Sequence, residues 1–232
     1  MLLRYYHLLP GEPLTFLALV GFGIIALVVA ITIHEFSHTF VANGLGDSTA
    51  KNQGRLSLNP IKHLDPVGTV MILMAGFGWG KPVPVNPHRL AHGSMGTTLV
   101  AAAGHLSNLM VAFLLAVPIK LGILEFTGLQ FYSMRDLVNG GSLDLLSALV
   151  TLIIILNLFL AVFNLIPLSP LDGSRVLEGF VPREKSASYV RLQQYGPVVL
   201  IAVIMIDYMS SFSILGTLMG PVVELLLTIA VG

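Results

Sequence analysis

The sequence predicts an all-α, polytopic membrane protein. Hydrophobic residues make up 55% of the chain and charged residues only 10%, whereas soluble domains average about a quarter charged residues. Several apolar runs approach the ~20 residues that a helix needs to cross the hydrocarbon of a bilayer. For a length of 232 residues, we expect a single integral-membrane domain, residues 1–232, folded as a bundle of about five to six transmembrane helices.

Charge and cysteine content narrow the classes of partner. The formal net charge is zero, which argues against nucleic acid as a partner. The chain has no cysteine, so disulfides and thiolate metal ligands are excluded. Neither observation indicates an oligomeric state.

Loops of unlike charge join the apolar segments. Basic residues gather in 47–97 and 172–194, whereas acidic residues outnumber basic ones in 122–142. The positive-inside rule therefore places the two basic regions in the cytoplasm, or its organellar equivalent, and the third region on the opposite side. The long apolar segments between them are residues 14–43, 97–121, 143–166 and 197–231, the last interrupted at 207–213.

A shorter apolar stretch, residues 67–77, has basic residues on both sides. It is about half as long as a membrane span requires, so its two ends should lie on the same side of the membrane. We interpret it as a re-entrant or surface-lying segment, which is tolerated where protein buries the irregular backbone. The alternative is a kinked full span, which would reverse the sidedness of everything after it.

The pentapeptide His34-Glu35-Phe36-Ser37-His38 lies within the first apolar segment. On a helix, the two histidines fall one turn apart on the same face and can share one Zn²⁺, while Glu35 is placed to take a proton from an attacking water. Metal-binding side chains are costly at membrane depth, so their presence there indicates function. The predicted chemistry is peptide hydrolysis with one zinc per chain.

Asp172 is the best candidate for the third protein ligand that a catalytic zinc site requires. Pro167 and Pro170 must end or sharply bend the third long helix before it, and Gly173 relaxes the turn behind the carboxylate. A plain Asp-Gly turn is the alternative. However, the first and third long segments finish on the same side of the membrane, which brings this carboxylate to the depth of the two histidines.

These residues make the chain resemble the site-2 proteases, which are intramembrane zinc metalloproteases. The likeness pairs the His34–His38 pentapeptide with Asn164-x-x-Pro167-x-x-x-x-Asp172-Gly173. Segments 54–60, 65–69 and 80–87 resemble the compact bacterial-type branch without PDZ or CBS domains. One departure is visible: such sequences commonly read Ala-Gly-Pro before a central asparagine, and this one reads Gly104-His105-Leu106-Ser107-Asn108.

The resemblance implies that His34, His38 and Asp172 hold zinc, that Glu35 is the general base, and that Asn164 faces the scissile carbonyl, where it can stabilise the oxyanion. It also implies substrates with peptide bonds in or next to transmembrane segments of membrane proteins. We therefore expect a multi-pass protein of the cell (plasma) membrane bilayer, with its active site toward the cytoplasmic side.

A metal-ion transporter or metal-binding membrane protein that uses the same ligands is the alternative function. Transporters often carry internal repeats and repeated polar sites along a path, and the sequence shows neither. Glu35 separates the two functions, since transport can survive its replacement by glutamine and proton transfer cannot.

Residues 54–59 and 81–86 alternate like strands, and each runs into an Asn-Pro pair. They predict a short β-hairpin near the active site, whose edge would receive an unwound substrate segment as an added strand. Pro82 and Pro84 suit an edge strand, where a missing N–H does no harm. An ordinary surface loop is the alternative.

Overall fold

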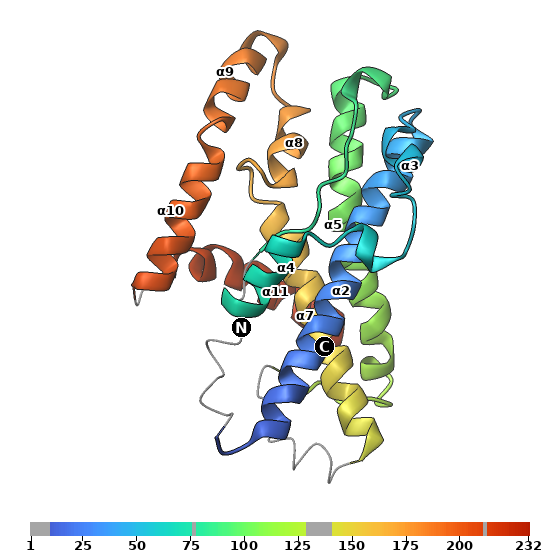
Figure 1. Ribbon diagram of the computed structural model, residues 1–232, viewed down its shortest axis with the longest axis vertical. Helices are drawn as coiled ribbons and strands as arrows, with labels where there is room; N and C mark the ends of the chain where they lie inside the picture. The colour runs from blue at the N-terminus through green and yellow to red at the C-terminus, as the bar shows by residue number, and fades with distance from the viewer. Residues whose placement is uncertain (1–9, 76–77, 129–140, 211–212) are drawn as a thin grey trace.

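The computed structural model describes residues 10–75, 78–128, 141–210 and 213–232, and these residues form helices without a sheet (Figure 1). Among them, four helices are long and apolar enough to cross a membrane, and a bent pair of helices makes a fifth if it forms one span. The all-α membrane class is confirmed, with four to five candidate spans rather than five to six in the described part of the chain. The four are α2 (Pro13–Gly44), α5 (Ser94–Lys120), α7 (Ser142–Asn164) and α11 (Ile214–Val231).

Shorter elements join these helices. The bent pair consists of α9 (Arg183–Gln193) and α10 (Gly196–Met209), with an angle of 44° between them. The remaining elements are α3 (Thr49–Asn52), η2 (Pro60–Lys62), α4 (Pro66–Ala75), η3 (Pro87–Arg89) and α8 (Asp172–Glu178).

Helices α2, α5 and α7 pack against one another, and α11 packs against α5 and α7. Small side chains on α5, Ala112 and Ala116, meet the fully buried Ile154 and Leu158 of α7. Lipid tails are as apolar as these side chains, so helix association in a bilayer depends on close packing, which small residues permit. The alanines therefore let α5 pack closely against α7.

The two ends of the bundle carry different connections. In Figure 1, α2 ends, α5 begins, and α3, α8 and α9 gather at the same end, whereas α5 ends and α7 begins at the opposite end. Both basic loop regions thus share one end of the bundle. This arrangement agrees with the relative sidedness predicted from charge.

Helix α4 covers most of residues 67–77, the short apolar stretch that the sequence predicts to be either a re-entrant segment or a kinked full span. Its 10 residues extend ~15 Å at the usual rise, about half of the ~30 Å hydrocarbon thickness. In Figure 1, α4 lies about midway along the bundle, and the chain on both sides of it leads back toward the end that carries α3. The structure therefore agrees with a re-entrant segment rather than a full span, up to residue 75; residues 76–77 lie outside the described part.

The predicted β-hairpin is wrong for the described residues 54–59 and 81–86, which contain no strand. An isolated antiparallel bridge joins Leu64 and Gly80 nearby. Without N–H groups at Pro82 and Pro84, the second segment cannot support a regular hydrogen-bonded ladder from these residues.

A buried arginine side chain replaces the missing strand partner. The Nη2 atom of Arg55 donates to the carbonyls of Lys81 and Pro82, at 2.7 and 2.8 Å. The Lys81 N–H in turn donates to the carbonyl of His63 at 2.7 Å. The two segments are therefore held together as predicted, but by a guanidinium group rather than by backbone pairing.

Asp47 anchors the loop that follows α2. Its Oδ1 atom accepts a hydrogen bond from the Thr49 N–H at 3.0 Å, and its Oδ2 atom accepts one from the Asn86 N–H at 2.7 Å. Burial alone would raise the pKa of this carboxyl, but the hydrogen bonds from Thr49 and Asn86 outweigh burial and hold the pKa below its ordinary value. The carboxylate form is thus the form that stabilises the loop.

Replacement of Asp47 by alanine is expected to lower the free energy of unfolding by ~1–3 kcal/mol at neutral pH, because buried N–H groups lose their acceptor. The ionised Asp47 carboxylate contributes its full stabilisation above the ordinary carboxyl pKa of ~3.9. This stabilisation is lost as the pH falls through the lower pKa of Asp47 in the folded state. The free energies of unfolding of wild type and Asp47→Ala would be measured in detergent at neutral and at strongly acidic pH. The difference between wild type and Asp47→Ala should narrow in acid, and a difference independent of pH would contradict the role of the carboxylate.

Candidate metal centre

Helix α2 places two histidines on one face. His34 and His38 are 4% and 6% exposed, and the centroids of their rings lie 4.6 Å apart. Asp172, at the first position of α8, brings its Oδ2 atom to 3.0 Å from the Nε2 atom of each histidine. Ligand atoms of all three residues lie within 4.8 Å of one another. The structure therefore brings together the three side chains that the sequence predicted as metal ligands.

The hydrogen bonding of His38 fits a cation at this site. Its Nδ1 atom lies 2.7 Å from the carbonyl oxygen of Val100, and a carbonyl can only accept, so Nδ1 carries the proton. In the neutral imidazole, Nε2 is then an acceptor, yet it faces a carboxylate oxygen of Asp172. A cation between these two acceptors satisfies both. Two imidazole nitrogens and one carboxylate oxygen, with a fourth position left for water or substrate, form a donor set typical of catalytic Zn²⁺.

The loop before Asp172 follows the break that the prolines predict. Helix α7 ends at Asn164, and α8 starts eight residues later at Asp172. Gly173 acts differently from the prediction, since its backbone is not in the left-handed region that favours glycine. Instead, a Cβ atom at this position would lie 2.2 Å from the carbonyl oxygen of Leu165. Glycine is required here because the chain folds back tightly against its own backbone.

Helix α9 holds this loop in place, which the sequence did not predict. The Gln193 side chain accepts from the Ser169 N–H at 2.7 Å and donates to the Pro167 carbonyl at 3.1 Å. One turn earlier, the Tyr189 hydroxyl donates to the carbonyl of Ser174 at 2.6 Å. The only available sequence signal was two polar residues four positions apart on a helix. Together these bonds fix the backbone on both sides of the ligand carboxylate.

Glu35 lies beside the segment that Arg55 holds. A Cβ atom added to Gly80 would lie 3.4 Å from the Oε1 atom of Glu35, so the backbone at position 80 runs directly past the carboxylate. Burial lowers the pKa of the Arg55 guanidinium, and the negative charge of Glu35 acts in the opposite direction. The predicted general base thus lies next to the ligands, between α2 and the segment that returns from α4.

Two asparagines of α7 bond within their own helix. Asn164 donates from Nδ2 to the carbonyl of Leu160 at 3.1 Å. The buried Asn157 donates to the carbonyl of Ile153 at 2.8 Å. The catalytic role of Asn164 at the oxyanion stays a prediction.

Helix α5 forms the wall behind His34. A Cβ atom at Gly104 would lie 2.5 Å from the Cε1 atom of His34 and 2.7 Å from both of its ring nitrogens. The α5 backbone therefore touches the imidazole directly. Any side chain at position 104 would have to displace a predicted metal ligand.

Gly104→Ala is expected to weaken zinc binding by roughly 10–100-fold, the range seen when an outer-shell support of a ligand is lost. The added methyl group would push the His34 ring away from its position. Gly21→Ala, in helix α2, is the matched control because nothing lies within 4 Å of a Cβ atom there. Competition with a chromophoric chelator would measure both affinities, and equal affinities for the two variants would contradict this account.

The fold and the site define a membrane-embedded zinc metalloprotease. The model of Peptidase family M50 matches residues 86–206. A Bacillus subtilis relative, YwhC, is 42% identical over 185 residues, which are 80% of this chain and 80% of that protein. A Mycobacterium tuberculosis relative, Rip2, is 30% identical over 200 residues, which are 83% of this chain and 71% of that protein. Both are named "Putative zinc metalloprotease".

The chain belongs to the M50 family of peptidases, the site-2 proteases, and is an intramembrane zinc metalloprotease. Nothing in these comparisons favours the metal-transporter alternative. No solved structure matches the chain significantly.

Proposed function

We propose that the protein hydrolyses peptide bonds in or next to transmembrane segments of other membrane proteins. The observation that carries this proposal is a cluster of three metal ligands next to Glu35, of which the two histidines are buried and lie on the spanning helix α2. A carboxylate and two imidazoles at this depth are costly unless they serve a function. A substrate that reaches them must itself lie at the membrane.

Each residue has a distinct role in the proposed reaction. His34, His38 and Asp172 would hold zinc, because the Nε2 atoms of the two histidines and the Oδ2 atom of Asp172 lie together. Zinc, when bound, polarises the scissile carbonyl and lowers the pKa of water toward ~7. Glu35 takes a proton from the attacking water and passes it to the leaving amine. Asn164 exchanges its bond to the Leu160 carbonyl for one to the developing oxyanion.

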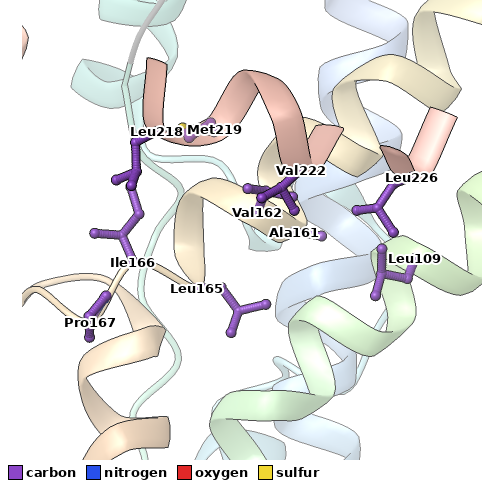
Figure 2. Close-up of a pocket in the computed structure, with 10 residues that line it drawn as sticks. All are labelled: Leu109, Ala161, Val162, Leu165, Ile166, Pro167, Leu218, Met219, Val222 and Leu226. Atoms are coloured by element: carbon purple, nitrogen blue, oxygen red, sulfur yellow. The ribbon is translucent and has the colours of Figure 1, made fainter. Parts of the chain in front are cut away.

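An apolar pocket of about 490 Å³ lies between α5, the end of α7 and α11 (Figure 2). Leu165, Ile166 and Pro167 line it and belong to the loop that leads to Asp172. Its lining is almost entirely apolar, so side chains of a membrane segment are the kind of substrate group that it suits. This supports a substrate that approaches from the bilayer.

We place the protein in the cell membrane with the active site toward the cytoplasm. Asp172 starts α8, which lies at the same end of the bundle as both basic loop regions (Figure 1), and basic loops stay in the cytoplasm. The chain has no cysteine, so single cysteines can report the sidedness. In intact cells, an impermeant thiol reagent should label Ile123→Cys and not Lys51→Cys; the reverse pattern would overturn the orientation.

Cleavage of tagged single-span peptides by the purified protein in liposomes tests the function itself. We expect cleavage within or beside the apolar segment, loss of cleavage after chelation of zinc, and recovery when zinc is returned. The control is the same cleavage sequence in a soluble peptide without the apolar flanks. Equal cleavage of both peptides would contradict a membrane substrate, and no cleavage of any peptide at full zinc loading would contradict protease activity.

A further inference from the structure

The two histidines of the metal centre differ in the support that they receive. His38 has an acceptor for its Nδ1 proton in the Val100 carbonyl, at 2.7 Å. The Nδ1 atom of His34 is buried and has no hydrogen-bond partner among the described residues. A histidine that ligates a metal through Nε2 carries its proton on Nδ1 and almost always donates it to an outer-shell acceptor. His34 therefore requires an acceptor that sequence motifs did not identify.

A second buried imidazole, His105 of α5, lies next to His34. His105 is buried, with 3% of its surface exposed. Its ring lies edge-on to that of His34, with the ring centroids 5.7 Å apart and the ring planes at 76°. Neither of its ring nitrogens has a hydrogen-bond partner among the described residues. Two adjacent buried imidazoles thus each have a ring nitrogen without a hydrogen-bond partner among the described residues.

A neutral imidazole carries its proton on one ring nitrogen and accepts through the other. One nitrogen of His105 can therefore accept the Nδ1–H of His34 while the other keeps the proton.

We propose that His105 is a positioning residue for the metal centre, which accepts the Nδ1–H hydrogen bond of His34 and so fixes the orientation of that ligand. A small rotation of either ring, or one buried water between them, completes the bond. The inference rests on the proposed ligation of zinc by His34. It gives His34 the support that Val100 gives to His38, with a side chain in place of a backbone carbonyl.

The test measures zinc affinity of the purified full chain by chelator competition, together with thermal stability of the zinc-free protein. His105→Leu removes the acceptor, and His105→Gln restores one through its Oε1 atom. Thr32→Val is the matched control, since its hydroxyl is also buried and has no partner among the described residues. We expect His105→Leu to weaken zinc binding roughly 10–100-fold, with His105→Gln within a few-fold of wild type and Thr32→Val unchanged.

Three results would overturn the inference. Zinc binding by His105→Leu as tight as that of wild type would show that His34 needs no partner at position 105. Both His105 variants could weaken binding equally and lower the stability of the zinc-free protein, which would show a packing role alone. If wild type itself bound no zinc, the proposed ligation by His34 would fail as well, and this result is distinct from the other two.

Discussion

Glu35→Gln is expected to abolish peptide hydrolysis while the protein keeps its zinc. Glutamine has nearly the shape of glutamate but cannot take a proton from water, and proton transfer of this kind contributes about 10²–10⁴-fold to a rate. The two histidines on α2 and Asp172 remain in place, because their ligand atoms cluster without Glu35. Cleavage of single-span peptides and the zinc content of the same preparation would be measured together.

Glu224→Gln is the matched control for this experiment. Glu224 is an exposed carboxylate on the spanning helix α11, so its change removes the same charge without touching the metal centre. We expect wild-type cleavage and zinc content from it. Undiminished cleavage by Glu35→Gln would exclude Glu35 as the base, whereas loss of zinc along with cleavage would place Glu35 among the groups that hold the metal.

The metal ligands were predictable because each depends on local rules. The spacing of His34 and His38 follows from the helical repeat, which puts residues four apart on one face. Asp172 followed from the number of protein ligands that catalytic zinc takes and from prolines that had to end α7 nearby. The structure brings these residues together through the packing of α2 and α8 against the same helix, α5.

The supporting contacts were not predictable, because they depend on which surfaces pack together. The Val100 carbonyl that bonds His38 is a backbone group, and every residue has one, so the sequence holds no signal for it. A glycine in a membrane helix permits close helix packing, but the contact of Gly104 with the His34 ring depends on the register between α2 and α5. The bonds from Gln193 to the loop before Asp172 depend in the same way on the position of α9.

The hairpin prediction failed for a related reason. Alternation along residues 54–59 and 81–86 predicted strands, and the two segments do lie together. The Arg55 side chain, however, takes the carbonyls that a neighbouring strand would have paired. A pattern of period two describes a possible backbone shape, but it does not show whether a side chain or a strand satisfies the backbone groups.

Asp172→Asn is expected to remove zinc and hydrolysis together. The amide is neutral and a much weaker ligand than a carboxylate, which is one of the oxygen donors that zinc takes in catalytic sites. Loss of an outer-shell partner costs about 10–100-fold in metal affinity, and loss of a direct ligand should cost more. Chelator competition on the purified protein, with peptide cleavage alongside, would measure both effects.

Asp144→Asn is the matched control, because Asp144 lies in the first turn of α7 as Asp172 lies in the first turn of α8. Both changes remove a charge that favours a helix N-terminus, but only Asp172 contacts the two histidines. Wild-type zinc affinity in Asp172→Asn would mean that the third ligand is another residue. Loss of zinc in Asp172→Asn, set against retained zinc in Glu35→Gln, would separate the residue that holds the metal from the residue that moves the proton, although both lie at the same site.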